Sequence, residues 1–167
     1  AYDVIAERFS VMPTAIEANI KHPIVVTQGS FEESRGNSQA HIYIGVESLT
    51  DMSYNPELET MHTMFSYILG SGMSSRLFKT VRIENSLAYS VYSRDISYGN
   101  QSILILSAAT EVANTEKANG MMHDLLNDMK KGVTFAEYEK AKNMMISDIV
   151  SMSERSSDIV DVAVQHM

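Results

Sequence analysis

Residues 69–78 read LGSGMSSRLF, and residues 81–93 read VRIENSLAYSVYS. The first stretch ends one helix and starts another, because its two glycines favour a break and Ser74 or Ser75 can cap the next helix. The second stretch continues that helix through Arg82. It becomes a strand at Leu87, where alternation with a period of two begins. We therefore expect a helix, a break, a second helix and a strand, in this order.

The strand pattern after residue 87 assigns side chains to two faces. One face carries Tyr89, Val91 and Ser93, and the other carries Ala88, Ser90 and Tyr92. Residues 95–100, which include Gly99-Asn100, predict a turn, and residues 102–112 are rich in Ile and Leu and predict the next strand. Upstream, residues 24–27 form a β-branched run, and residues 39–46 alternate with Ile42, Ile44 and Val46 on one face. These two segments predict a hairpin with a long loop.

Helices are indicated by capping residues and by apolar stripes. One helix starts at Asn55-Pro56-Glu57, since Asn can cap free amides and Pro has no amide to leave unpaired. A second starts at Thr115 and stops at Gly132, and a third starts at the capping box of Thr134 and Glu137. A last helical stretch is expected from about residue 158. The predicted inward side chains are Leu58, Met61, Met64 or Phe65, Ile68 and Leu69; Ala118, Met121, Met122, Leu125, Leu126 and Met129; and Tyr138, Ala141, Met145, Ile149 and Met152.

The order of these elements predicts an α+β fold, a two-layer sandwich in which helices pack on one face of an antiparallel β-sheet. The length suits one domain over residues 1–167. The chain lacks an initiator Met and ends inside a predicted helix. We therefore expect it to be truncated at both ends relative to a longer parent chain.

Composition and charge exclude several classes of function. The formal net charge is −8, which argues against nucleic acid or an anionic membrane as a partner. There is no cysteine, and no apolar run approaches the length of a membrane span. No two of the five histidines have the spacing of a metal pair on a helix. Because no signal-peptide pattern is present, we expect a cytoplasmic protein.

One pair of residues has a pattern that suits chemistry. Arg82 closes a predicted helix, and Tyr89 opens the following strand. A cation and a phenol that bracket one turn can both hydrogen-bond a carbonyl oxygen and stabilise an oxyanion. The spacing alone also fits a surface ion pair of Arg82 with Glu84 or Glu57 and a half-buried strand tyrosine.

The quoted stretch resembles the central motif of the second homologous domain in insulinase/pitrilysin-type zinc metallopeptidases, a family that includes the mitochondrial processing peptidases and many bacterial proteins. The usual motif reads LGGGMSSRLF, two or three further residues, VRE, a few polar residues and GLAYSVYS. The resemblance covers roughly residues 20–167. It implies the zinc-free, C-terminal type of domain, because the zinc motif HxxEH is absent here.

The resemblance also implies a function. The family's zinc-bearing half faces this type of domain across a closed chamber that holds a peptide. The family's Arg and Tyr, seven residues apart, match Arg82 and Tyr89 and would bind the substrate carbonyl. Zinc is expected in the parent protein or in a homologous partner subunit, with none bound by this segment.

Two departures from the family motif are visible. Ser71 replaces the middle glycine of the triple-glycine run, and Ser86 replaces a glycine before the strand. The loss of a glycine at residue 86 narrows the range of backbone conformations that are allowed at the turn before the strand. Besides the peptidase, two other hypotheses stay open. One is a catalytically inactive family member that acts as partner or scaffold of an active homologue, and the other is an unrelated α+β binding module.

Overall fold

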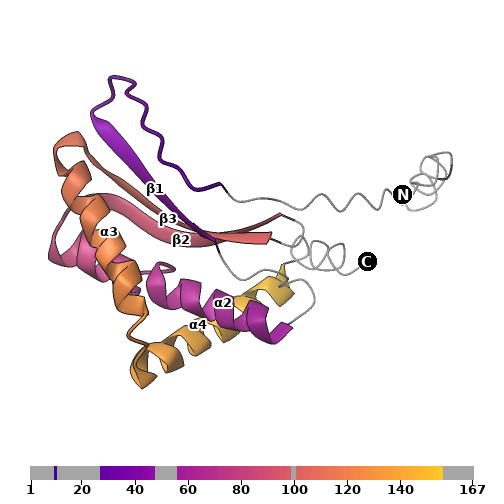
Figure 1. Ribbon diagram of the computed structural model, residues 1–167. Coiled ribbons are helices and arrows are strands. Elements are labelled where there is room, and N and C mark those ends of the chain that lie inside the picture. Colours follow the sequence, from indigo (N-terminus) through magenta and orange to yellow (C-terminus); the bar gives the residue numbers. More distant parts are fainter. Residues whose placement is uncertain (1–9, 11–26, 48–55, 99–100, 156–167) are drawn as a thin grey trace.

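The computed structural model describes residues 10, 27–47, 56–98 and 101–155. Within these residues, strands β1 (Gln39–Glu47), β2 (Ala88–Tyr98) and β3 (Gln101–Glu111) form one antiparallel sheet in the order β1-β3-β2. The helical elements are α2 (Pro56–Leu69), the π-helix η2 (Phe78–Glu84), the 3₁₀ turn η3 (Val112–Asn114), α3 (Thr115–Met129) and α4 (Phe135–Glu154). Helices α2, α3 and α4 lie on the same side of the sheet (Figure 1).

This arrangement confirms the predicted α+β fold with helices on one face of an antiparallel sheet. Helices α2 and η2 pack against β2, whereas α3 packs against β3 and β1. Helix α4 lies outside this layer and contacts the described fold mainly through α2. The largest apolar side chains that are fully buried between sheet and helices are Leu69, Leu77, Val81, Leu106 and Met122.

Strand β1 lies beside β3, with Ile42 opposite Ala108. Ile42 is buried on the helical side, while His41 and Tyr43 point to the other side and are exposed, so the predicted division of these residues between two faces is confirmed. Their rings stack with centroids 6.4 Å apart. We call this second side the open face of the sheet. The predicted strand over residues 24–27 lies outside the described residues except for Thr27, which is not in a strand.

The predicted turn over residues 95–100 is wrong for residues 95–98, because β2 continues to residue 98. Tyr98 pairs with Gln101, so only two residues connect the strands. Asp95 misled the prediction because its residue type is typical of turns. Its Oδ1 lies 3.0 Å from Nδ1 of His62 on α2, and both side chains are largely buried. Burial raises the pKa of Asp95, and the neighbouring His62 opposes that shift.

Two of the predicted inward stripes are wrong in part, whereas the stripe of α3 is confirmed. In α3, Ala118, Met122, Leu125 and Met129 are all buried. In α4 only Ala141 is buried, and the predicted inward residue Ile149 is 62% exposed. On α2 the predicted inward residue Met61 is 65% exposed. Within the described residues α4 packs on α2 instead of on the sheet. Helix α4 therefore buries only a narrow part of the apolar stripe that the sequence predicts.

The capping box of α4 is confirmed, and an arginine ties it to the segment before η2. The Oγ1 of Thr134 accepts from the N–H of Glu137 at 3.2 Å, and the Glu137 carboxylate accepts from the N–H of Thr134 at 2.8 Å. The same carboxylate accepts two hydrogen bonds from Arg76, at 2.7 and 2.9 Å. A third bond runs from Arg76 to the carbonyl of Gly132 at 3.0 Å. This bidentate pair fixes the start of α4 against the loop after α2.

Protonation of Glu137 is expected to weaken this connection. The hydrogen bond from Arg76 is the main cause that holds the pKa of Glu137 at about 2. A lowered pKa in the folded state contributes stability that is present above the unfolded value of about 4.3 and is lost as the pH falls towards 2. We therefore expect the urea midpoint to fall between roughly pH 6 and pH 3, and to fall less in Glu137→Gln than in the wild type.

Asp128→Asn is the matched control for this titration. Asp128 pairs with Lys131 at 2.6 Å, but both side chains are mostly exposed. Exposed pairs contribute little because water screens them, so this variant should follow the wild-type profile. Identical profiles for the wild type and Glu137→Gln would show that the Arg76 pair does not stabilise the fold.

Candidate functional site

Arg82 lies on η2, which is a π-helix of seven residues. The π-helix is rare in proteins and occurs frequently at functional sites. Val81 is fully buried and anchors η2 in the core, while Arg82 is exposed. The guanidinium carbon of Arg82 lies 4.9 Å from the ring centroid of Phe78. This cation–π contact positions the guanidinium and leaves its charge unneutralised.

The turn after η2 is closed by hydrogen bonds that bring β2 back to the helix. The N–H of Leu87 donates to the carbonyl of Val81 at 2.9 Å. The side-chain amide of Asn85 donates to the carbonyl of Thr80 at 2.8 Å. Between them, Ser86 has φ +50°, in the left-handed region that favours glycine. Arg82 and Tyr89 therefore lie on opposite sides of one closed turn.

The two departures from the family motif, at residues 86 and 71, differ in their effect on the backbone. Ser86 has a positive φ, so the glycine that it replaces suits the backbone at this position. Ser71 does not have a positive φ, and its N–H donates to the carbonyl of Ser66 at 3.1 Å. Only the change at residue 86 strains the turn.

Replacing Ser86 with glycine is expected to stabilise the domain by about 1 kcal/mol, because a left-handed conformation costs a residue with a Cβ roughly that much. The gain is partly offset by the larger entropy of glycine in the unfolded chain. Thermal unfolding of the variant and the wild type measures the difference. Ser71→Gly is the control and should be neutral or destabilising. A lower melting temperature for Ser86→Gly would mean that the turn is not strained.

Tyr89 lies at a β-bulge, which corrects its predicted face. In the ladder with β3, Ala88 pairs with Thr110 and Ser90 pairs with Ala109, so Tyr89 is the extra residue. The bulge turns Tyr89 away from the side of Val91 and Ser93, both of which are buried, and leaves it 56% exposed. Alternation with a period of two could not predict the face of Tyr89, because one inserted residue reverses the facing of the side chains that precede it relative to those that follow it.

The phenol of Tyr89 has a defined partner. Its hydroxyl donates to Oε1 of Glu111 at 2.7 Å. This hydrogen bond is the main cause of a raised pKa for Tyr89. A phenol is protonated at neutral pH, so the Tyr89 hydroxyl can act as a hydrogen-bond donor. The contact between Glu111 and Tyr89 could not be predicted from the sequence, because it depends on the strand register and on the bulge.

The structure places both predicted site residues at the surface on either side of the turn, and no hydrogen bond joins them among the described residues. The predicted alternative partners of Arg82 are wrong within that same part of the chain, where neither Glu84 nor Glu57 forms an ion pair with it. An exposed cation and a protonated phenol can both donate hydrogen bonds to a carbonyl oxygen and to the oxyanion that develops from it.

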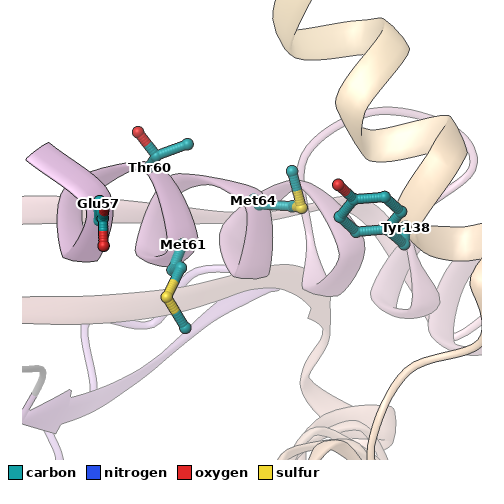
Figure 2. A pocket seen from close by; sticks show the side chains of 5 residues that line it. All are labelled: Glu57, Thr60, Met61, Met64 and Tyr138. Atoms are coloured by element: carbon teal, nitrogen blue, oxygen red, sulfur yellow. The ribbon is translucent and has the colours of Figure 1, made fainter.

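No group of three or more His, Asp or Glu side chains that could hold a metal occurs in the described part of the chain. The helices described there include none that is long and apolar enough to cross a membrane. A shallow groove of about 420 Å³ lies between α2 and α4, where Met64 faces Tyr138 (Figure 2). Neither Arg82 nor Tyr89 lines this groove.

Comparison with known sequences identifies relatives of this chain. Residues 1–145 match the family described as "Peptidase M16 inactive domain". The chain is 29% identical over 120 residues to the uncharacterised zinc protease YmxG of Bacillus subtilis, covering 71% of this chain and 29% of that protein. It is 32% identical over 126 residues to an uncharacterised zinc protease of Mycobacterium tuberculosis, covering 74% of this chain and 28% of that protein. The chain thus spans less than a third of the length of these relatives.

Solved structures share the fold. A protease from Helicobacter pylori superposes with a TM-score of 0.77 at 21% identity, covering 99% of this chain and 42% of that one. A peptidase M16 inactive domain from Pseudomonas fluorescens superposes with a TM-score of 0.62 at 22% identity, covering 77% of this chain and 30% of that one. At these identities the likeness establishes the architecture alone.

Proposed function

We propose, since this chain belongs to the family of peptidase M16 inactive domains, that it is the zinc-free, substrate-contacting half of a zinc metalloendopeptidase. The complete enzyme would cleave peptides inside a chamber closed by two halves. In this proposal Arg82 and Tyr89 hydrogen-bond the carbonyl oxygen of the peptide bond to be cleaved. Both would bind that oxygen more tightly as it gains negative charge, and this difference accelerates the reaction.

The observation that carries the proposal is that two backbone irregularities, a π-helix and a β-bulge, flank one turn. The π-helix η2 carries Arg82, and the β-bulge of β2 carries Tyr89. Each irregularity costs regular hydrogen bonding, and each leaves its polar side chain exposed. Irregularities of both kinds are over-represented at active sites, where they re-aim a side chain.

Zinc does not fit the described part of this chain, where no cluster of potential ligands occurs. In the proposal the metal is held by residues of a zinc-bearing half or of a homologous subunit. The residues of this chain bind and orient the peptide carbonyl and supply neutral and cationic hydrogen-bond donors. The name "zinc protease" of the relatives supports the presence of such a half in the complete protein.

A reconstitution experiment tests this division of labour. The 167-residue chain alone is expected to bind no stoichiometric zinc and to cleave no peptide. The full-length protein, or the chain mixed with its zinc-bearing half, is expected to cleave an unfolded peptide and to lose that activity with a chelator. Zinc-dependent cleavage by the purified chain alone would overturn the proposal. An upstream sequence without an HxxEH motif would instead favour the inactive partner or scaffold.

A further inference from the structure

Glu111 is the last residue of β3, and the sheet fixes its position. It pairs with Gln39 of β1, and its carbonyl accepts from Oγ1 of Thr115 at 3.4 Å. The residues of β3 alternate between the two faces, so Glu111 shares the open face with Ala109. Its backbone is thus held by a neighbouring strand on one side and by the start of α3 on the other.

The opposite side of the contact is fixed as well. The fully buried hydroxyl of Thr110 donates to the carbonyl of Leu87, the residue just before β2. This bond ties the backbone just before the bulge of β2 to Thr110, the residue that precedes Glu111. The Tyr89 ring and the Glu111 carboxylate therefore project from two backbone segments that are tied together two residues before Tyr89 and one residue before Glu111.

The carboxylate of Glu111 forms no ion pair with any residue that the structure describes. Its hydrogen bond from Tyr89 is 2.7 Å long, and both side chains are exposed. A tyrosine side chain that is more than half exposed would otherwise move between rotamers. A charge-assisted hydrogen bond to a fixed acceptor restricts that movement.

We infer that Glu111 is a positioning residue for Tyr89, which holds the phenol in the orientation from which it donates to the substrate. This inference rests on the proposed function of Tyr89. A phenol has a single hydrogen to donate, so a substrate carbonyl must replace the Glu111 carboxylate as its acceptor. Glu111 acts before that exchange, because it keeps Tyr89 directed along the open face until the peptide arrives.

A double-mutant cycle in the full-length protein tests the inference. Glu111→Ala is expected to lower kcat/KM about tenfold, which corresponds to the loss of about one hydrogen bond. Glu111→Gln is expected to retain most of the activity, because its amide oxygen still accepts from the phenol. In a Tyr89→Phe background, Glu111→Ala should cause no further loss. Glu116→Ala removes an exposed acid from the first turn of α3 and serves as the control with no effect.

A second readout is independent of activity. NMR titration of the tyrosine rings in the intact protein, with the Tyr89 signal assigned by its loss in Tyr89→Phe, should show a lower pKa for Tyr89 in Glu111→Ala and in Glu111→Gln. Additive losses of kcat/KM, or an unchanged Tyr89 titration, would overturn the role of Glu111. If Tyr89→Phe alone leaves kcat unchanged, the proposed function of Tyr89 fails, while the titration still decides whether Glu111 holds the ring.

Discussion

Replacing Gly70 with alanine is expected to lower the melting temperature of this domain by roughly 6–12 °C. The change corresponds to a loss of about 3 kcal/mol in the free energy of unfolding for a domain of this size. The cause is overpacking of the close contact between residue 70 and Ser93, and not the loss of an interaction. The expected effect is a large part of the stability of a natural domain, which is about 5–15 kcal/mol.

The reason lies in how closely the end of α2 approaches β2. A Cβ at residue 70 would lie 2.4 Å from the backbone nitrogen of Ser93 and 2.7 Å from its Cβ. The Oγ of Ser93 donates to the carbonyl of Ser66 at 2.9 Å and fixes the strand at this distance from the helix. Gly70 does not have a positive φ, so the glycine is required by the close approach alone. Backbone atoms cannot rotate away, so a methyl group would push α2 from the sheet.

Gly120→Ala is the matched control for Gly70→Ala. Gly120 lies inside α3, and nothing lies within 4 Å of a Cβ at this position. Alanine is favoured over glycine in a helix interior by about 0.8–1.0 kcal/mol, so this variant should be more stable than the wild type. Thermal and urea unfolding of both variants check the prediction. A stability of Gly70→Ala equal to that of the wild type would show that α2 and β2 are not in close contact in solution.

The features that could be predicted from the sequence are those with a local cause. The helix break at residue 70, the capping box at Thr134 and the stop at Gly132 each depend on a few adjacent residues. The stripe of α3 was also predictable, because that helix packs on the sheet with a full face. Arg82 and Tyr89 were singled out by their spacing around a turn and by the family motif.

The features that could not be predicted depend on contacts between distant parts of the chain. Tyr89 is placed by a bulge that exists only in the pairing with β3. Glu111 is its partner because of that register, and Asp95 lies in a strand that pairs with β3, beside His62 of α2. The exposed positions of α4 follow from its packing on α2. In each case the residue type suggests one environment, and a tertiary contact supplies another.

The second large effect is expected on catalysis. Under the proposed function, Arg82→Ala and Tyr89→Phe in the full-length protein should each lower kcat by about 10²–10³-fold, which is typical for loss of one oxyanion donor. The fold should stay intact, because both side chains are exposed and the anchors of the turn are Val81 and Leu87. Steady-state kinetics, with circular dichroism of each variant, measure both quantities.

Strand β2 supplies matched controls for these two variants. Arg94 and Tyr92 are exposed on the same strand, beyond the bulge. Arg94→Ala and Tyr92→Phe remove the same chemical groups and should change kcat little. A donor that acts in the transition state lowers kcat and kcat/KM together, whereas a residue that only binds substrate raises KM. Equal effects of the control and site variants, or a change confined to KM, would assign Arg82 and Tyr89 to substrate binding or to surface structure and remove them from the chemical step.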